Sequence, residues 1–329
     1  MHSKVIASVA SIALLAVLAA CGGTDNGNGS GGDAGNYPSE ELDWTIAFGP
    51  GGGNDIMART MVDILEQYDL YPENIRLDNR EGGSGATGWG YLLNQRGSGY
   101  GISTTSGSFI TTPLQADTGW TYEDFTPVGL FATDDALFVV PGDSDFDTWE
   151  DWVAYAKGQD KVVLGGIGTI NVDLILHELL AEAAGYEFEY VPFNEEGQLQ
   201  TALFSGSLDA MVSNTGSILG QVEAGEVKPL LYTGAERLEA LKDIPTGEEK
   251  GITDLPSMPR GMILPPDAPQ EAQDWWIDTM KEVVETPEWK EYIESNYLSE
   301  NIAWGEDFTT YLEETVAEFE TTLKEAGVL

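Results

Sequence analysis

Short apolar runs alternate with longer stretches in which apolar residues recur every three or four positions along most of this chain. The first run, residues 44–48, leads into a glycine-rich loop at 49–53. The stretch after the loop predicts a helix whose apolar side consists of Ile56, Met57, Met61, Ile64 and Leu65. A short apolar run is typical of a buried strand, and the wider spacing is typical of an amphipathic helix. The globular part therefore begins with a strand, a glycine loop and a helix.

The same alternation continues toward the C-terminus. It predicts strands at residues 75–79, 101–105, 126–132, 136–140, 161–165, 188–192, 208–213 and 229–233. Helices are expected through 91–93, over 149–157, from about 174 to a cap at Gly185, over 198–204 and after 217. From Glu271 onward the pattern predicts two or three amphipathic helices, separated around Pro287 and Trp304. Strands that alternate with helices predict an α/β fold with parallel sheets and helices on both faces.

A second glycine-rich turn, at residues 165–171, repeats the arrangement of the first one after another predicted strand. Glycine lets the backbone approach a ligand closely, and a helix N-terminus carries unpaired N–H groups with partial positive charge. Ligands of α/β sheets bind at the carboxyl ends of the strands. The two turns therefore predict two lobes that share a cleft for an anion.

The N-terminal residues predict export and lipid attachment. Lys4 precedes an almost wholly apolar run at residues 5–18, which is too short for a comfortable membrane span and fits a secretory signal. The following Leu-Ala-Ala-Cys resembles the lipobox of bacterial lipoproteins; an ordinary signal peptide is the alternative. We expect a signal at residues 1–20, lipidation of Cys21 and a flexible tether at residues 21–40. Cys21 is the only cysteine, so neither an intrachain disulfide nor a thiolate metal site is expected.

The net charge of −41, from 56 acidic and 15 basic residues, argues against nucleic acid and anionic lipid surfaces as partners. The many aromatic residues indicate a folded protein, so we interpret the charge as adaptation to high salt, which screens self-repulsion. Cation binding is the competing interpretation. Asp143, Asp145 and Asp147 begin like a calcium loop, but Thr148 replaces the turn glycine and Ala154 the bidentate glutamate. We therefore predict no metal site.

Cofactor and catalytic motifs are weak. No Gly-Lys-Ser/Thr follows the first glycine loop, as a phosphate-binding loop would require. Gly83, Gly85 and Gly88 match the dinucleotide fingerprint, yet the next strand ends without an acidic residue to hold a ribose. Outside the signal His177 is the only histidine, and its place within a helix favours packing. Paired carboxylates for acid–base chemistry stay open, but we predict no cofactor and no catalytic residue.

A mostly neutral polar set remains at the predicted strand ends. Its members are Asn54, Asp55, Ser106, Ser108, Thr169, Asn171, Asn194, Asn214 and Ser217. Each alone is equally well explained as a turn former or helix cap. Together, at the same sheet edges, they favour recognition of a small polar ligand.

Several segments give the chain a family resemblance. They are PGGGNDIMAR at 50–59, NREGGSGATG at 79–88, VPFNEEG at 191–197, GSLDAMVSNTGS at 206–217 and AGEVKPLLYTGAER at 224–237. In this order and spacing the chain, from about Trp44 to its end, resembles the Bug or TctC-like substrate-binding receptors of tripartite tricarboxylate transporters.

The resemblance implies a two-lobed type II periplasmic-binding-protein fold with mixed sheets, helices on both faces and a hinge of crossing strands. We expect lobe 1 at residues 41–133 and 234–329, and lobe 2 at 134–233. It also implies a carboxylate ligand held between the two glycine loops, partly through backbone N–H groups. The implied ligand-binding residues are Gly51, Gly52, Gly53, Asn54, Asp55, Ser106, Gly168, Thr169, Asn171, Asn194 and Asn214. Arg59 and Arg80 lie near these loops in the sequence and could assist.

The chain departs from the family pattern in the second loop. Asn171 and Val172 stand where many relatives have two serines, Leu174 where they often have histidine, and residues 194–196 replace a Lys-Gly-Gly type of turn. These departures leave the identity of the carboxylate open.

The predicted function is that of an extracytoplasmic, lipid-anchored and monomeric receptor without enzymatic activity. It would capture a small tricarboxylate, dicarboxylate or related organic acid and deliver it to the large and small membrane subunits of a tripartite tricarboxylate-type permease. Ligand bridging both loops would close the lobes. The alternatives are an α/β enzyme that acts on a carboxylate and a sensor subunit with the same fold.

Overall fold

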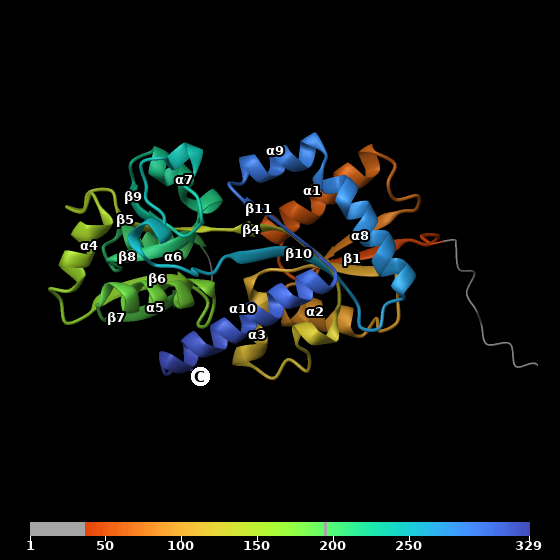
Figure 1. Ribbon diagram of the computed structural model, residues 1–329, viewed down its shortest axis with the longest axis horizontal. Helices are drawn as coiled ribbons and strands as arrows, with labels where there is room; N and C mark the ends of the chain where they lie inside the picture. Colours follow the sequence, from red (N-terminus) through yellow and green to blue (C-terminus); the bar gives the residue numbers. More distant parts are fainter. Residues whose placement is uncertain (1–36, 194–195) are drawn as a thin grey trace, which may run out of the picture. The chain divides into compact units, whose positions relative to one another are not determined.

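Two mixed β-sheets with helices packed on them make up the part of the chain that the computed structural model describes, residues 37–193 and 196–329 (Figure 1). The first sheet has the order β11-β4-β10-β3-β1-β2 and the second the order β7-β6-β8-β5-β9. The strands of the first are β1 Leu42–Ile46, β2 Ile75–Asn79, β3 Gly101–Thr104, β4 Thr126–Asp134, β10 Met258–Leu264 and β11 Ser299–Trp304. Those of the second are β5 Ala136–Pro141, β6 Val162–Ile167, β7 Phe188–Phe193, β8 Ala210–Asn214 and β9 Val227–Tyr232.

Helices cover both faces of the first sheet, because neighbouring residues of its strands enter different cores. Met262 of β10 packs in one core with α1 Gly53–Gln67, α8 Gln270–Val284 and α9 Pro287–Ser295. Ile263 packs in the other with α2 Ala86–Leu93, α3 Gly107–Gln115 and α10 Glu306–Glu325. This alternation is the two-residue period of a strand buried on both faces. We call this sheet with its helices the first lobe.

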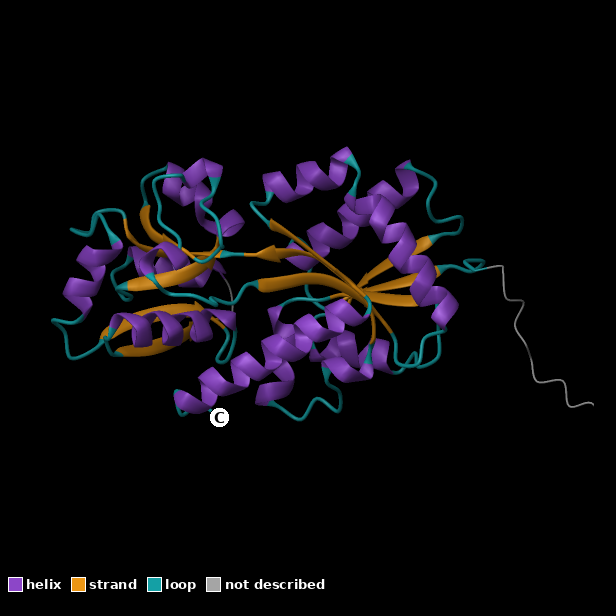
Figure 2. Cartoon of the chain, viewed as in Figure 1, coloured by secondary structure: helices purple, strands orange, loops and turns teal. Residues whose placement is uncertain are grey.

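The second sheet is covered in the same way. Phe138 of β5 faces α4 Trp149–Ala156 and α5 Val172–Ala184. Leu137 faces α6 Glu196–Phe204 and α7 Thr215–Glu223. The predicted cap of α5 is confirmed, since Gly185 ends this helix with φ of +74°, a conformation that favours glycine. We call this sheet with its helices the second lobe (Figure 2).

The lobes are connected through their strands and through α10. Asp135 alone separates β4 of the first sheet from β5 of the second, and residues 233–257 lead back from β9 to β10. The carboxylate of Asp135 accepts hydrogen bonds from Tyr232 and Ser299, on strands of different sheets, and from Ser257. Helix α10 contacts α3 of the first lobe and α5 of the second. The predicted hinge of crossing strands is present at Asp135.

Some elements were not predicted. The strands β10 and β11 and the helix α3 are absent from the prediction. Pro259 and Gly261 interrupt the pattern of β10, and Pro113 lies within α3. The strand β11 pairs irregularly with β4. Ile56 was expected on the apolar side of α1, and this was wrong, since 41% of its surface is exposed. The turn of α1 places its neighbours Met57 and Met61 in the core instead.

The predicted signal, Cys21 and most of the tether lie outside the described residues. No helix within the described ranges is long and apolar enough to cross a membrane. The exact lobe boundaries at residues 41, 133 and 234 stay a prediction.

Candidate functional site

The loop before α1 is held in shape by its own aspartate. The carboxylate of Asp55 accepts hydrogen bonds from the N–H of Gly51 at 2.9 Å, from Asn79 Nδ2 at 2.9 Å and from two nitrogens of Arg59. The bonds from Arg59, and then those from Gly51 and Asn79, outweigh burial and lower the pKa of Asp55 to about 2. These contacts make Asp55 the residue that positions the loop, and its direct contact with a ligand stays a prediction.

A buried arginine lies against the start of α1. A Cβ atom at Gly53 would lie 2.8 Å from Nη2 of Arg260, a residue of β10. Arg260 is 8% exposed and pairs with the carboxylate of Asp134, the last residue of β4. Gly53 thus leaves room for a guanidinium beside the first N–H groups of a helix, and both groups attract an anion. Sequence reasoning missed Arg260 because β10 itself was not recognised.

The second glycine loop is fixed between β6 and α5. Gly168 has φ of +78°; its N–H donates to the carbonyl of Phe193 at 2.9 Å, and Tyr190 donates to its carbonyl at 3.0 Å. Thr169 is exposed, whereas Asn171 is buried at the N-cap of α5. The Asn171 side chain does not cap the helix, and its Oδ1 has no hydrogen-bond partner. The loop therefore holds a buried amide available to another group.

Two acidic side chains lie at the helix starts of the second lobe. The Asp173 carboxylate accepts a hydrogen bond from the N–H of Ile167 at 2.7 Å. Burial raises the pKa of Asp173 to about 7 against that bond, and the negative charges of Glu196 and Asp134 add to the effect. Burial also raises the pKa of Glu196, which accepts a hydrogen bond from Ser213. Neither acid stood out in the sequence, because acidic residues occur everywhere in it.

Ser106, Asn171 and Asn214 lie around Met258. They are three of the predicted ligand-binding residues, and each follows or ends a different strand. A Cβ atom at Gly107, the residue after Ser106, would lie 2.8 Å from Val172, 3.4 Å from Met258 and 3.5 Å from Asn171 Oδ1. Asn214 Nδ2 lies 3.6 Å from the sulfur of Met258. Ser106, Asn171 and Asn214 are thereby brought close together. Gly53 lies next to Arg260 instead, and Asn194 lies outside the described residues.

Direct contacts between the lobes narrow the space between the two loops. Gln115 of α3 donates a hydrogen bond to the carbonyl of Ile170 at 2.6 Å, and a Cβ atom at Gly216 would lie 3.0 Å from the carbonyl oxygen of Asn296. The negative charge of Asp134 is the smallest of the influences that raise the pKa of Asp173. We call this region the interlobe site: the two glycine loops with Ser106, Asn214, Arg260, Asp134, Asp173 and Glu196.

Comparison with known proteins decides the family. The model of the family described as "Tripartite tricarboxylate transporter family receptor" matches residues 58–328. The chain belongs to this receptor family. Its members are extracytoplasmic solute-binding receptors, in agreement with the resemblance found in the sequence.

Relatives of the receptor share its length and its fold. A Cupriavidus necator protein, "UPF0065 protein in gbd 5'region", is 22% identical over 294 residues, which cover 89% of each chain. The solved structure of the R. palustris protein Rpa4515 with adipate has a TM-score of 0.77 and 22% identity, covering 89% of this chain and 99% of that one. MatC from Rhodopseudomonas palustris, with bound malate, has a TM-score of 0.71 and 17% identity, covering 87% and 100%. These likenesses confirm the predicted two-lobed periplasmic-binding-protein fold.

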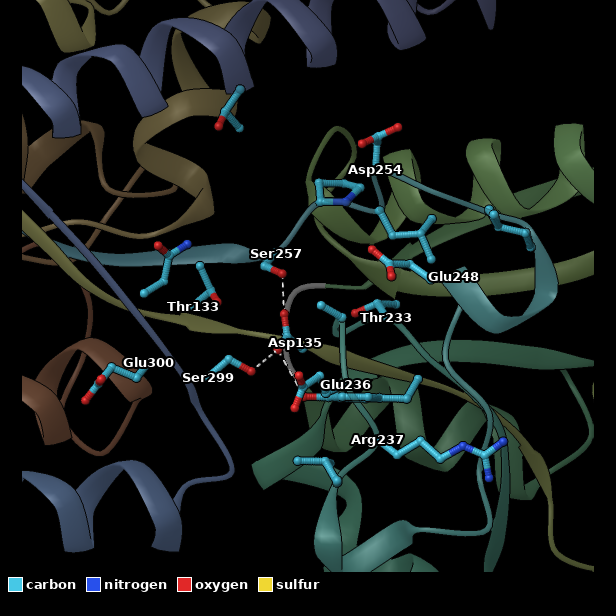
Figure 3. A pocket seen from close by; sticks show the side chains of 18 of the residues that line it. Thr133, Asp135, Thr233, Glu236, Arg237, Glu248, Asp254, Ser257, Ser299 and Glu300 are labelled. Atoms are coloured by element: carbon cyan, nitrogen blue, oxygen red, sulfur yellow. Dashed lines mark hydrogen bonds between the residues drawn. The ribbon is translucent and has the colours of Figure 1, made fainter.

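A separate cavity of about 760 Å³ opens beside the hinge of the receptor (Figure 3). It is lined by residues such as Thr133, Asp135, Thr233, Ser257 and Ser299, and Asp135 lies among the hydroxyl groups that bond to it. None of the ten predicted ligand-binding residues that lie in the described ranges lines this cavity. We nevertheless place the candidate ligand-binding site at the interlobe site, because the glycine loops, helix starts and unpaired buried polar atoms there are features of ligand recognition. In the hinge cavity, by contrast, the hydroxyl groups of Ser257 and Ser299 already bond to Asp135.

Other residues considered in the sequence have structural roles. His177 is buried, its Nε2 lies 3.0 Å from the carbonyl of Gly165, and burial lowers its pKa to about 4, so the expected packing is confirmed. Arg59 pairs with Asp55. Arg80 pairs with Asp78 and lies over the ring of Tyr91. In the described ranges, no three His, Cys, Asp or Glu side chains are grouped so that they could hold a metal ion.

Asp173 gives the receptor a predictable pH dependence. Its pKa is 3.8 without perturbation and about 7 in the folded protein, so between these values the native state retains a proton that the unfolded chain has lost. The contribution of Asp173 to the free energy of unfolding is therefore greatest below pH 4. It decreases as the pH rises from 4 to 7, and it is constant above pH 7. Asp173→Asn should remove this decrease, which amounts to a few kcal/mol. Urea unfolding of the wild-type protein and of Asp173→Asn between pH 4 and pH 7 measures the two pH dependences. If the free energy of unfolding falls equally in both proteins, the prediction is wrong.

Proposed function

We propose that the receptor captures a small organic carboxylate at the interlobe site and delivers it, without catalysis, to the membrane subunits of a tripartite tricarboxylate-type permease. The observation that carries the proposal is the approach of two helix starts from different lobes: Gly107 begins α3 and lies against Asn171 and Val172 at the start of α5. Helix N-termini favour anions. Adipate and malate in the two solved relatives support the ligand class.

The binding step follows from the loops. Gly53 brings the first N–H groups of α1 next to Arg260, so a carboxylate there would receive hydrogen bonds from the backbone and a paired positive charge. Residues 168–171 would contact the same molecule from the second lobe. Because the ligand then touches both lobes, its binding favours their closed arrangement over an open one.

The hinge supports such a movement. Asp135 alone connects the strands of the two sheets at one point, and residues 233–257 connect them at the other. A connection as short as Asp135, at the ends of two strands, can absorb the backbone change of domain closure. The permease would distinguish the closed receptor from the open one by the surface that both lobes form together.

We further propose that lipidated Cys21 attaches the receptor to the outer face of the cell membrane through residues 21–40, and that it acts as a monomer. Its net charge of −41 would be tolerated in high salt, where screening limits both self-repulsion and long-range repulsion of an anionic ligand. Under these conditions the affinity for the carboxylate comes from contacts at short range, with the backbone N–H groups of the helix starts and with Arg260.

A thermal-shift screen in about 1 M KCl tests the proposed function, since at that salt concentration the exposed charges are screened. Carboxylates of different length and number of charges are compared with the corresponding amides, which lack the negative charge. A carboxylate at one hundred times its dissociation constant stabilises the native state by about 2.7 kcal/mol. If no carboxylate raises the melting temperature above the effect of its amide, the proposed function is wrong.

Gly53→Val should abolish ligand-induced stabilisation. Its Cβ atom would lie 2.8 Å from Nη2 of Arg260, so the guanidinium has to move away from the start of α1. Gly53 itself is exposed, but displacing the guanidinium disturbs its buried pair with Asp134, so the melting temperature without ligand should fall as well. The matched control is Gly90→Ala in α2, where an added Cβ meets no atom within 4 Å and ligand binding should persist. Loss of folding in Gly53→Val would show instead that this glycine is needed for the fold.

A further inference from the structure

The hinge cavity lies on the opposite face of the connecting strands from the interlobe site. Successive residues of an extended chain point to opposite faces. Asp134 belongs to the interlobe site, whereas its neighbours Thr133 and Asp135 line the cavity (Figure 3). The other connection has the same alternation, since Ser257 lines the cavity and the next residue, Met258, lies against the interlobe site. The two spaces are therefore back to back across the hinge.

Both lobes contribute walls to the hinge cavity. Ser299 and Glu300 belong to β11 of the first sheet, and Tyr232 ends β9 of the second. Helix α10, which contacts both lobes, adds Tyr311 and Glu318. A rotation about the hinge that separates the lobes at the interlobe site brings the walls on the opposite face together. A molecule that fills the cavity would therefore favour the closed arrangement of the lobes.

The hinge cavity has a large excess of negative charge. Seven acidic residues and one basic residue, Arg237, line it, and Arg237 pairs with Glu249 outside the cavity. None of the seven acids forms an ion pair with a basic residue of the described ranges. Burial, and then the negative charge of Asp254, raises the pKa of Glu318, so these two lining carboxylates repel each other. The cavity thus lacks a counter-ion.

A buried hydroxyl group in the cavity also lacks a partner. Thr133 is 6% exposed and lines the cavity, and its side chain forms no hydrogen bond with any residue that the structure describes. The carboxylate of Asp135, by contrast, already accepts hydrogen bonds from three hydroxyl groups. A hydroxyl oxygen accepts a hydrogen bond from an N–H donor, and an ionised carboxylate can only accept. A ligand that fits the cavity therefore brings donors and positive charge.

The lining suits an organic cation better than a metal ion. Across residues 37–193 and 196–329, no three acidic, histidine or cysteine side chains converge to hold a metal. The acids are instead distributed around a cavity of about 760 Å³, a volume typical of small-molecule sites. Leu238, Ile252 and Leu255 also line it and offer contacts to methylene groups, and the ring of Tyr311 attracts an ammonium group. Separate charges joined by an apolar chain match this lining.

We propose that the hinge cavity binds an aliphatic diamine or polyamine, whose ammonium groups are held by the lining carboxylates and Thr133 and whose binding favours closure of the lobes. Each ammonium group supplies N–H donors and a positive charge, and an alkyl chain lets separate ammonium groups reach separate acids. The site is distinct from the interlobe site and does not depend on the carboxylate proposed there. Only its effect on closure rests on the lobe movement inferred under the proposed function.

Isothermal titration calorimetry of the full chain in about 1 M KCl tests the site, since salt at this concentration screens non-specific association with the acidic surface. The probes are spermidine, 1,5-diaminopentane, 1,5-pentanediol and magnesium chloride. One molecule of at least one amine should bind per receptor, whereas the diol, which has the same chain without the charges, should not bind. If neither amine binds, or if Mg²⁺ binds as tightly as the amines, the proposal is overturned.

Two double variants of equal net charge separate the cavity from the rest of the acidic surface. Asp254→Asn, Glu318→Gln removes two lining carboxylates, and asparagine tolerates the positive φ of +59° at residue 254. The matched control Asp243→Asn, Glu314→Gln changes exposed residues outside the cavity, on the same connection and on the same helix. The first should weaken amine binding about tenfold or more, through lost charge-assisted hydrogen bonds, and the control should not. Equal amine affinities of the two proteins would overturn the proposal.

Small-angle X-ray scattering tests the effect on closure without any carboxylate. A saturating concentration of the bound amine should reduce the radius of gyration of the wild-type receptor and of the control variant. The same concentration should leave the radius of gyration of Asp254→Asn, Glu318→Gln unchanged. A wild-type radius of gyration that does not respond to the amine would overturn the coupling to closure, and calorimetry would still decide the amine site.

Discussion

Arg260→Met should lower the free energy of unfolding by about 3–5 kcal/mol. Its side chain and that of Asp134 are only 10% and 8% exposed, so removing the guanidinium leaves a carboxylate buried without its counter-ion. Breaking a buried ion pair is costly for this reason, and the loss should appear as a lower midpoint in urea unfolding. The measurement needs no ligand and is independent of the proposed function.

Two further proteins make this test specific. Arg96→Met removes an arginine whose partner Asp267 and whose own side chain are largely exposed, and it should cost less than about 1 kcal/mol. In the double variant Arg260→Met, Asp134→Leu no charge remains unpaired, and much of the stability should return. An Arg260→Met protein as stable as Arg96→Met would show that water reaches Asp134.

Trp89→Ala should lower the free energy of unfolding by about 3–5 kcal/mol as well, for a different reason. Trp89 is fully buried under the first sheet, with ring centroids 5.1 Å from Phe109, 5.6 Å from Trp120 and 5.6 Å from Phe48. Its indole N–H donates to the carbonyl of Thr104 at 3.1 Å. Truncation removes apolar contact on several sides and leaves a cavity with an unpaired carbonyl.

Trp89→Phe is the control for this prediction. It retains an aromatic ring and should lose less stability than Trp89→Ala, with the lost hydrogen bond and the smaller ring as the remaining cost. Urea unfolding of the wild-type protein, Trp89→Phe and Trp89→Ala measures the free energy of unfolding of each, and we expect it to decrease in this order. A loss of 1 kcal/mol or less in Trp89→Ala would mean that Phe109 and Trp120 close the space.

The sequence was sufficient to predict those parts of the fold in which the local residue pattern and the packing favour the same element. The strand at residues 75–79 and the Gly185 cap were predicted at the positions found, because a short apolar run and a glycine at a helix end act locally. The strand β10 was not, since Met-Pro-Arg-Gly-Met-Ile-Leu contains two residues, Pro259 and Gly261, that are unfavourable in a central strand. Its position between β3 and β4 is decided by long-range pairing.

The same distinction applies to the site. The two glycine loops were recognised because glycines before a helix have a local meaning. Arg260, Asp173 and Glu196 were not, because their importance comes from burial and from each other's charges. In a chain with 56 acidic residues, two particular ones become informative only when the fold shows which are removed from water. Asp55 was predicted as a ligand contact, which stays a prediction, and the fold adds that its hydrogen bonds hold the loop.

The position of β10 also constrains the order in which the chain can assemble. This strand lies between β3 and β4, although more than one hundred residues separate it from β4 in sequence. Until residues 258–264 have emerged during synthesis, β3 lacks its partner on one side and β4 lacks partners on both sides, since β11 comes later still. The first sheet cannot be completed before then. Pairing over such separations is slow, because closing a long loop costs entropy before the contacts form. A growing chain of this receptor therefore cannot complete its first lobe until most of the chain has been made.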